Sequence, residues 1–355
     1  MRVVVSAGGT GGHIYPALAL INKIKDLEPN SEFLFIGTHN RMEKDIVPRH
    51  DINYYPLTVT GLKRKVTLEN FRVMGQFMRA IRKAKSVIED FDPDVVVGFG
   101  GYVTAPVIVA ANQLKIPTLI HEQNSISGLA NKWLGKVSTA VAVSFEETLK
   151  DYSKNAFFSG NPCSEEAIRK KPLKNPLFKK KRPLVVMSMG SLGSASVNKM
   201  IPELITIAAS KNYNLVIGTG KGGFEQYKDL KTSDNVLIVD YIEDIVGLLK
   251  TADLFISRAG ATTISEIGVI GVPTIFIPSP YVTANHQVLN AKSLVERDAA
   301  LVLEEKDLTS NKLSELIDET LADETKLKKL RRNLKKTAVK NSATLIYEKL
   351  CEIKK

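Results

Sequence analysis

The segment Ser6–Pro16, Ser-Ala-Gly-Gly-Thr-Gly-Gly-His-Ile-Tyr-Pro, combines four glycines with a threonine and a histidine. Glycines permit positive φ and bring bare backbone N–H groups close to a ligand. A helix N-terminus behind such a turn favours an anion, usually a phosphate. His13 adds an imidazole, which titrates near neutral pH and suits a general base. The segment therefore predicts an anion site beside a candidate base. The alternative is a strand-to-helix turn without a ligand, in which His13 only orients the turn.

A second segment of this kind is Arg258-Ala-Gly-Ala-Thr-Thr-Ile-Ser-Glu266. It predicts a helix that begins near Ala261, with the hydroxyls of Thr262 and Thr263 at its positive end. Glu266 lies one turn further along, where it can accept hydrogen bonds from two ribose hydroxyls. The alternative for Glu266 is a capping box with Thr263, three residues before it.

Both segments lie in a chain that alternates between strand-like and helix-like runs, which is typical of parallel sheets with helices on both faces. Before the first turn, Met1–Val5 predicts a buried strand, and after it the apolar spacing predicts a helix whose first residue is Pro16. Further strands are expected at 33–36, 95–97, 118–120, 140–143, 184–187, 215–217, 236–239, 254–257 and 274–278. Ligands bind beyond the carboxyl ends of such strands, so Gly98–Pro106 and His121–Asn124 are predicted to share the first turn's site.

The polar, proline-bearing and basic stretch from Asn155 to Lys181 predicts a linker. After it, Ser188–Gly193 restarts the pattern of strand, glycine turn and helix. We therefore predict an α/β protein of two Rossmann-like, doubly wound parallel-sheet domains, 1–162 and 163–340, with a cleft between them. The final helix, about 341–355, is expected to pack back on the first domain.

The composition of the 355 residues, 44% hydrophobic and 25% charged, is that of a globular protein. We expect it on the cytoplasmic side, since the sequence has no membrane-length apolar run and no signal-peptide pattern. Two cysteines predict no disulfide. The net charge of +11 suits a phosphorylated substrate, anionic lipid or nucleic acid. With one tryptophan and no aromatic-rich basic pattern, a nucleic-acid-binding protein is the disfavoured alternative.

The expected helix from Leu68 to Asp90, preceded by Lys63–Lys65, mixes large apolar and basic residues. It is either a core-packed helix with a solvated basic face or an interfacial helix that contacts anionic lipid. Asp92 and Asp94 resemble the acidic pair of a metal-dependent sugar transferase. They precede the strand at 95–97, at the wrong edge for a site, so we interpret them as a turn.

Three familiar chemistries are disfavoured. No segment carries the lysine of a Walker A motif, and no His, Cys or Asp residues have metal-ligand spacing. The first turn does not match the Gly-x-Gly-x-x-Gly fingerprint of dinucleotide-binding folds. Gly37-Thr38 also stands where that fold needs an acidic residue for the ribose.

Six segments, taken in order, strongly resemble a family of bacterial cell-wall glycosyltransferases. The segments are Gly8–His13, Gly100–Pro106, His121–Asn124, Gly160–Pro162, Gly190–Ser191 and Arg258–Glu266. Members of this family transfer N-acetylglucosamine from UDP-N-acetylglucosamine to the 4-hydroxyl of undecaprenyl-diphosphate-linked N-acetylmuramoyl-pentapeptide.

The resemblance implies an inverting enzyme of the GT-B fold without an obligatory cofactor or metal. It implies a role in peptidoglycan synthesis, and so in cell shape and division. It also implies peripheral attachment to the anionic cytoplasmic face of the inner membrane, with proteins of cell-wall synthesis as further partners. Another UDP-sugar enzyme of the same fold, a glycolipid transferase or a UDP-N-acetylglucosamine 2-epimerase, remains the alternative.

The resemblance also implies residue roles. His13 is the candidate general base, and His121 and Glu122 are the alternative candidates for the base if His13 only binds the acceptor. The donor contacts it implies are Thr10, Gly11, Gly12, Asn124, Ser191, Ile242 (uracil), Ala261, Thr262, Thr263, Glu266 (ribose) and Gln287, with Ser164 and Arg258 as weaker matches. The acceptor diphosphate is assigned to Gly9, Gly100, Gly101 and Tyr102. The sequence departs from the family at Met189, Leu192 and His286, and at Ser164, where an arginine is common.

Overall fold

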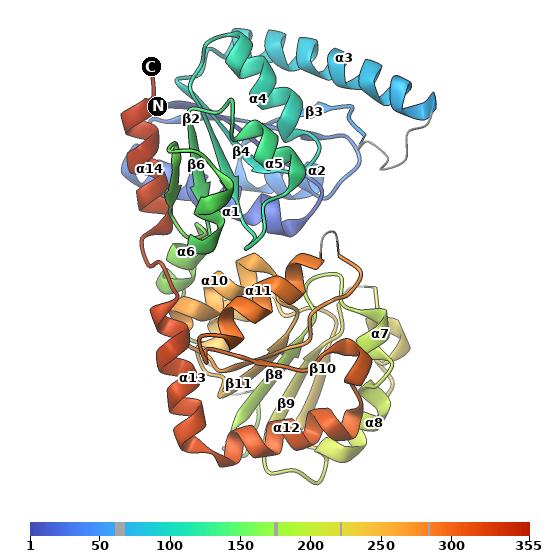
Figure 1. Cartoon of the computed structure of the whole chain (residues 1–355). Coiled ribbons are helices and arrows are strands. Elements are labelled where there is room, and N and C mark those ends of the chain that lie inside the picture. Colours follow the sequence, from blue (N-terminus) through green and yellow to red (C-terminus); the bar gives the residue numbers. More distant parts are fainter. Residues whose placement is uncertain (61–67, 174–176, 221, 283–284) are drawn as a thin grey trace. The chain divides into compact units, whose positions relative to one another are not determined.

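The computed structural model describes residues 1–60, 68–173, 177–220, 222–282 and 285–355. The chain forms two compact units (Figure 1). The first comprises Met1–Glu165 with Asn341–Lys355, and the second comprises Glu166–Lys340. Within the described residues, no helix has the length and apolar character needed to cross a bilayer.

The first unit is built on a parallel sheet of seven strands in the order β3-β2-β1-β4-β5-β6-β7. The strands are β1 (Arg2–Ala7), β2 (Glu32–Thr38), β3 (Asn53–Leu57), β4 (Val95–Gly100), β5 (Thr118–Glu122), β6 (Ala140–Val143) and β7 (Ala156–Phe158). The helices and 3-10 turns are α1 (Gly11–Leu27), α2 (Glu43–Ile46), η1 (Val47–His50), α3 (Leu68–Phe91), α4 (Thr104–Gln113), α5 (Leu129–Leu134), η2 (Glu146–Asp151) and α14 (Ser342–Ile353). A further helix, α6 (Cys163–Arg169), begins in the first unit and ends in the second.

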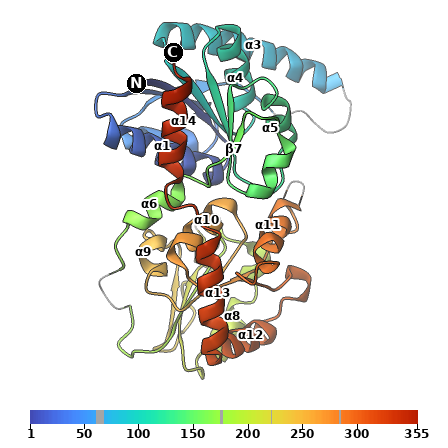
Figure 2. The same cartoon turned by 60° about the vertical axis from the view of Figure 1, so that its left-hand side comes forward.

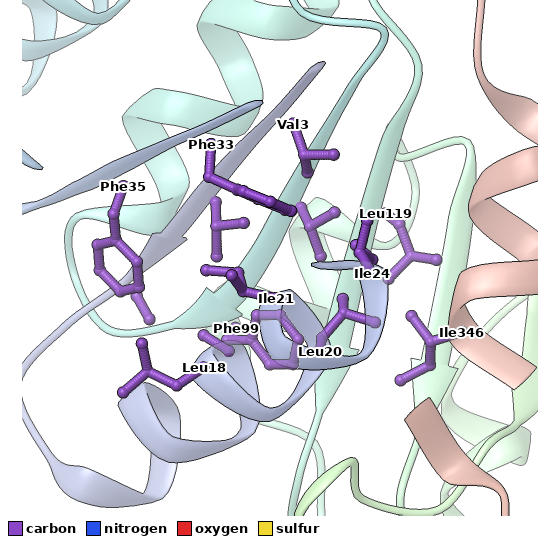
Figure 3. Packing of buried hydrophobic residues seen from close by; sticks show 14 of the residues in the cluster. Val3, Leu18, Leu20, Ile21, Ile24, Phe33, Phe35, Phe99, Leu119 and Ile346 are labelled. Atoms are coloured by element: carbon purple, nitrogen blue, oxygen red, sulfur yellow. The ribbon is translucent and has the colours of Figure 1, made fainter. Parts of the chain in front are cut away.

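Both faces of this sheet are covered, which explains why its strands are almost wholly apolar. Successive side chains of β1 point to opposite faces. Val3 and Val5 lie in one fully buried cluster with α1 and α14, and Val4 lies in the cluster beneath α3 and α4. Figure 3 shows the first of these clusters, in which Ile21 and Ile24 of α1 lie among side chains of the sheet.

The final helix, α14, packs beside α1 in the first unit (Figure 2). Ile346 and Leu350 are buried in the cluster beneath α1. The hydroxyl of Tyr347 donates to the Glu28 carboxylate at 2.8 Å. Helix α14 thereby completes the hydrophobic core that β1 and α1 form in the first unit.

The second unit repeats the architecture with a six-stranded parallel sheet in the order β10-β9-β8-β11-β12-β13. Its strands are β8 (Leu184–Ser188), β9 (Asn214–Gly218), β10 (Val236–Val239), β11 (Leu254–Ser257), β12 (Thr274–Phe276) and β13 (Leu301–Val302). Its helices and 3-10 turns are α7 (Ala195–Asn198), α8 (Ile201–Ala208), η3 (Phe224–Gln226), α9 (Ile245–Leu249), α10 (Ala261–Ile270), α11 (His286–Val295), η5 (Glu305–Asp307), α12 (Ser310–Ala322) and α13 (Glu324–Lys336).

Three local expectations are wrong. The first helix begins at Gly11, so Pro16 lies inside it. Of the four glycines in the first turn, only Gly9 has a positive φ, and Gly11 and Gly12 already belong to the helix. The stretch expected to be a linker, Asn155 to Lys181, instead contains strand β7 and helix α6 in its first half.

The interpretation of Asp92 and Asp94 as a turn is confirmed. Asp92 adopts a positive φ of 45°, and a carboxylate oxygen of Asp94 accepts the backbone N–H of Arg2 at 2.7 Å. The pair therefore fastens the amino ends of β1 and β4.

Candidate active site

The glycine-rich turn joins β1 to α1 at the carboxyl edge of the first sheet. Thr10 is the N-cap residue of α1 with an extended backbone, and its carbonyl accepts the N–H of His13 at 3.1 Å. No acidic residue lies in the first turn of this helix. The positive end of the α1 dipole is therefore not offset from within its own first turn, which favours an anion nearby.

His13 is held in one tautomer by its own turn. Its Nδ1 lies 2.9 Å from the carbonyl oxygen of Gly8, which can only accept, so Nδ1 carries the proton. Nε2 then carries the lone pair that a general base requires.

Two glycines at the end of β4, Gly100 and Gly101, make room for this arrangement. Gly100 has a φ of 108°, and a Cβ there would lie 3.0 Å from the Nε2 of His13. A Cβ on Gly101 would lie 2.4 Å from the Gly8 carbonyl oxygen. The N–H of Gly8 donates to the carbonyl of Gly100 at 3.1 Å. The two loops are thus fixed against each other, and Tyr102 follows as an exposed side chain.

A residue that the sequence did not single out, Glu43, supports the turn from beneath. Its fully buried carboxylate accepts the backbone N–H of Gly9 at 3.1 Å. It also accepts the N–H and hydroxyl of Thr38, at 3.0 and 2.6 Å. Glycines at 8 and 37 leave space for it, since a Cβ at either position would come within 3 Å of Glu43. The Gly9 N–H, expected to contact the acceptor diphosphate, donates instead to this internal anion.

Glu122 has a similar structural role after β5. Its buried carboxylate accepts the backbone N–H groups of Asn124 and Gly128, each at 3.0 Å, and the side-chain amide of Asn131 at 2.8 Å. It therefore holds the loop that carries Asn124, and its expected role as a substitute base is not supported.

His121 is also unsuited to act as the base. It is fully buried, and its Nε2 lies 3.0 Å from the carbonyl oxygen of Gly160. Burial lowers the pKa of His121 to about 4; the nearby His13 adds to the lowering, and the Gly160 hydrogen bond opposes it. Of the three candidate bases, His13 alone has the geometry for the role.

In the second unit, α10 begins directly after the turn that follows β11. Gly260 is its extended N-cap residue, and no acidic side chain lies in the first turn. Thr262 and Thr263 occupy that turn. The Thr262 hydroxyl oxygen is buried and has no hydrogen-bond partner among the described residues. A buried hydroxyl without a partner is costly, so it marks a position where a ligand oxygen would be stabilised.

Glu266 lies within α10 and is partly buried. Burial, and to a lesser degree the carboxylate of Glu166, raises its pKa to about 8. Because the helix begins at Ala261, Thr263 is not an N-cap residue, and the capping-box interpretation of Glu266 is wrong.

The Arg258 side chain forms hydrogen bonds and an ion pair within the second unit. Its guanidinium donates to the carbonyl of Ile277 at 2.8 Å and to the hydroxyl of Ser194 at 2.6 Å. It also forms an ion pair with the carboxylate of Glu305, with an N···O distance of 2.6 Å. Arg258 therefore ties β12, the loop after β8 and η5 together, and a direct contact with the donor diphosphate is not supported.

The remaining donor candidates divide between the units. Ile242 lies beyond β10, and its side chain would be 3.2 Å from a Cβ on Gly218. Ser191 lies in the turn after β8, and Gln287 accepts the N–H of Ser279 at 2.8 Å. Ser164 belongs to the first unit, and its buried hydroxyl bonds that of Ser342 at 2.7 Å, so its weak assignment to the donor is not supported.

Among the described residues, no cluster of three or more His, Cys, Asp or Glu side chains is arranged to hold a metal ion. The arrangement instead offers hydrogen-bond donors and helix N-termini. Thr10–His13, Asn124 and Gly100–Tyr102 lie at or just beyond the carboxyl ends of strands of the first sheet, and Ser191, Ile242 and Ala261–Glu266 follow strands of the second.

Models of two glycosyltransferase domains match the chain. The N-terminal domain of glycosyltransferase family 28 matches residues 3–143, and its C-terminal domain matches residues 184–346. The two units therefore define a family 28 glycosyltransferase of the GT-B type.

Relatives that match over their full length identify a narrower family within the family 28 glycosyltransferases. A UDP-N-acetylglucosamine–N-acetylmuramyl-(pentapeptide) pyrophosphoryl-undecaprenol N-acetylglucosamine transferase from Bacillus pumilus is 43% identical, with 99% of each chain covered. The protein of the same name from Bacillus subtilis is 40% identical over the whole of both chains. The chain belongs to this family of N-acetylglucosamine transferases, as the resemblance of its sequence segments indicated.

Solved structures agree with the fold. The crystal structure of Acinetobacter baumannii MurG has a TM-score of 0.75 at 27% identity and covers 99% of this chain and 100% of its own. A UDP-N-acetylglucosamine 2-epimerase from Neisseria meningitidis has a TM-score of 0.68 at 15% identity, with 99% and 100% covered. The second likeness shows the shared fold alone.

The contacts of Glu43 generate a prediction. Replacing Glu43 with glutamine keeps the shape but leaves an amide NH₂ facing one of three donors. We expect Glu43→Gln to lower the free energy of unfolding by about 1–3 kcal/mol, and to lower kcat by loosening the turn that carries His13. Urea unfolding and steady-state kinetics measure the two effects. Asp45→Asn makes the same chemical change at an exposed site of the same helix and should alter neither quantity. Equal behaviour of the two variants would contradict the role of Glu43.

Proposed function

We propose that this chain transfers N-acetylglucosamine from UDP-N-acetylglucosamine to the 4-hydroxyl of undecaprenyl-diphosphate-linked N-acetylmuramoyl-pentapeptide, forming the lipid-linked disaccharide precursor of peptidoglycan. The identity of 40–43% to relatives named for this transfer, over essentially their whole length, supports the proposal most strongly. Transfer of radiolabelled sugar to a short-chain lipid-linked acceptor tests it. An epimerised UDP-sugar without any transfer product would favour the alternative enzyme.

In the proposed step the acceptor hydroxyl attacks the anomeric carbon of the donor. A bond forms between that oxygen and that carbon, the bond from the carbon to the diphosphate oxygen breaks with inversion, and UDP leaves. The Nε2 of His13 takes the proton of the hydroxyl, since its Nδ1 proton is held by Gly8. The positive end of α10 and the Thr262 hydroxyl offset charge on the departing diphosphate. No obligatory cofactor takes part in this step as we propose it.

The role of His13 predicts a specific kinetic defect. A general base contributes about 10²–10⁴-fold in rate, so His13→Ala should lower kcat by that order. UDP affinity, measured by calorimetry, should stay nearly unchanged, because the proposed uridine contacts lie in the second unit. The acidic limb of the pH–rate profile should flatten, because only unprotonated imidazole is active. His50→Ala, an exposed histidine in the same unit, serves as the control. A near-normal kcat with a raised acceptor KM would reassign His13 to acceptor binding.

The raised pKa of Glu266 predicts a pH dependence of nucleotide binding. A carboxylate accepts two ribose hydroxyls better than the protonated acid, so binding favours the ionised form. In the free chain the pKa is about 8, and below it binding requires release of a proton. UDP affinity should therefore rise from pH 6.5 to pH 8.5 and level off above that range.

Calorimetry with UDP at several pH values measures this dependence. The same titration of Glu266→Gln corrects for the ionisation of UDP itself. This variant should bind UDP more weakly, and its affinity should depend less on pH. If UDP affinity depended on pH in the same way in the wild-type protein and in Glu266→Gln, Glu266 would not be the residue that binds the ribose.

We further propose that the first unit attaches peripherally to the anionic cytoplasmic face of the inner membrane, where proteins of cell-wall synthesis are its expected partners and nucleic acid is not. Large apolar side chains are exposed on α5, where Leu129 is 87% and Trp133 50% exposed. The partly exposed Lys132 lies between them and pairs with the Asp151 carboxylate at 3.1 Å. Met74 and Met78 are likewise exposed on α3. Lys63–Lys65, expected to contribute, lie outside the described residues.

Co-sedimentation with vesicles tests this attachment. Binding should require anionic lipid, weaken with salt, and fall several-fold in the variant Leu129→Ser with Trp133→Ser. Leu192→Ser removes an equally exposed apolar side chain, 79% exposed, from the second unit and should have no effect. Equal binding to neutral vesicles, or none at low salt, would refute the proposal.

A further inference from the structure

A cavity of about 470 Å³ lies in the first unit between β3 and α3, two elements that adjoin in Figure 1. His39, which directly follows β2, and Thr58, which directly follows β3, both line it. The cavity therefore lies at the carboxyl edge of the sheet, the same edge at which the turn of His13 follows β1. None of its lining residues has a role in the step proposed above.

The polar side chains around this cavity include two cations. Arg79 and Lys83 lie one helical turn apart on α3, and among the described side chains neither pairs with a carboxylate. The Nζ of Lys83 lies 5.7 Å from the centre of the Tyr55 ring, within the range of a cation–π contact. No acidic residue is among the described residues that line the cavity. The positive charge of the lining is therefore not neutralised from within it.

Gln76 adds a further hydrogen-bond donor to the lining. Its side-chain oxygen accepts the hydroxyl of Thr60 at 2.5 Å, so this oxygen is already engaged and the amide NH₂ is left to donate. The buried Leu57 and Ala80 supply an apolar part of the lining. Two cations and an amide donor suit an oxyanion, and the apolar surface beside them suits a ligand that also carries carbon groups.

The strand order places this cavity and the expected diphosphate site on opposite sides of the His13 turn. β2 and β3 lie to one side of β1, and β4, which ends at Gly100 and leads into Gly101 and Tyr102, lies to the other. The muramoyl sugar of the acceptor carries its diphosphate on carbon 1 and its peptide through carbon 3, next to the 4-hydroxyl. With that hydroxyl at His13 and the diphosphate toward β4, the peptide is the branch that can extend toward β3.

We propose that Arg79, Lys83 and Gln76 bind a carboxylate of the acceptor's peptide, an inference that rests on the function proposed above. Two inter-strand spacings, roughly 10 Å, separate β1 from β3. An extended peptide covers about 3.3–3.6 Å per residue, so roughly three residues cross this distance. Carboxylates in the far part of the pentapeptide, including the terminal one, therefore reach the cavity. The cations determine how tightly a peptide is bound and leave the rate of the chemical step to the groups around His13.

Two short-chain lipid-linked acceptors test the proposal, one with a free-acid pentapeptide and one with every peptide carboxylate amidated. In the wild-type protein, the KM of the free-acid acceptor should be about five- to tenfold lower, since each partly exposed ion pair contributes only modestly. The two acceptors should share the same kcat, because the carboxylates lie away from the reacting hydroxyl. Added salt should narrow the difference in KM.

A matched pair of charge variants assigns this difference to the cavity. Arg79→Gln with Lys83→Gln should raise the KM of the free-acid acceptor to that of the amidated one, while the KM of the amidated acceptor and of the donor stay unchanged. Arg82→Gln with Lys85→Gln removes the same charge from the same helix outside the lining. This control should keep the wild-type difference.

A variant that narrows the cavity without changing its charge gives a second measurement. Thr58→Trp introduces a large side chain at an exposed position of the lining. It should raise the KM of the free-acid pentapeptide acceptor several-fold. For an acceptor that carries no peptide, with its lactyl group as the amide, kcat/KM should stay at the wild-type value, which shows that the variant is folded.

The outcomes separate this proposal from the proposed function. Equal KM values for the two peptide acceptors in the wild-type protein, or a difference that Arg79→Gln with Lys83→Gln leaves in place, would overturn the peptide site. Loss of binding to anionic vesicles in that variant, with the KM difference unchanged, would also overturn it, in favour of a lipid headgroup phosphate. Absence of turnover with every acceptor in the wild-type protein would instead contradict the proposed function itself.

Discussion

The close approach of two backbone turns is the constraint on which the first unit's site depends. Gly8 donates its N–H to the Gly100 carbonyl and accepts a hydrogen bond from His13 through its own carbonyl. A Cβ at Gly101 would clash with the Gly8 backbone, and one at Gly100 would crowd the His13 ring. The imidazole of His13 is therefore oriented by the backbone of the turn that follows β1. Orientation of this kind reduces the reorganisation that proton transfer would otherwise require.

The buried carboxylates of Glu43 and Glu122 also hold the loops at the carboxyl edge of the first sheet. Glu43 satisfies donors of the first turn and of the end of β2, and Glu122 satisfies donors of the loop after β5. A buried anion is costly unless its oxygens accept several hydrogen bonds, and each of these does so from three or more donors. The carboxyl edge of the sheet is thus organised by residues that take no part in the chemistry proposed for it.

The sequence predicted the features that depend on local patterns. Runs such as Val95–Val97 predicted strands because parallel strands buried on both faces need continuous apolar residues. The start of α10 at Ala261 was predicted because glycine precedes a helical run. The start of α1 was misplaced because proline is commonest at the first helical position, whereas here Pro16 lies in the second turn.

Features that depend on tertiary contacts were missed. Glu43 lies in a helix of four residues with no motif around it, so only its three donors reveal its role. One usable signal was the pair of glycines at 8 and 37, whose missing side chains leave space for the carboxylate and the Cγ of Glu43 respectively. The role of Arg258 could not be inferred either, because its partners Ser194 and Glu305 are distant in sequence. β7 was overlooked because a strand of three partly buried residues carries almost no pattern.

The turns that precede α1 and α10 differ in charge, and this difference bears on which ligand each can bind. In the first, an internal carboxylate already accepts the Gly9 N–H, so negative charge stands close beneath the turn. In the second, the first turn of α10 holds no carboxylate, and the buried Thr262 hydroxyl is without a partner among the described residues. A nucleotide diphosphate is therefore better stabilised at the second turn. At the first turn, the same negative charge would instead stabilise the imidazolium that forms if His13 takes a proton from the acceptor hydroxyl.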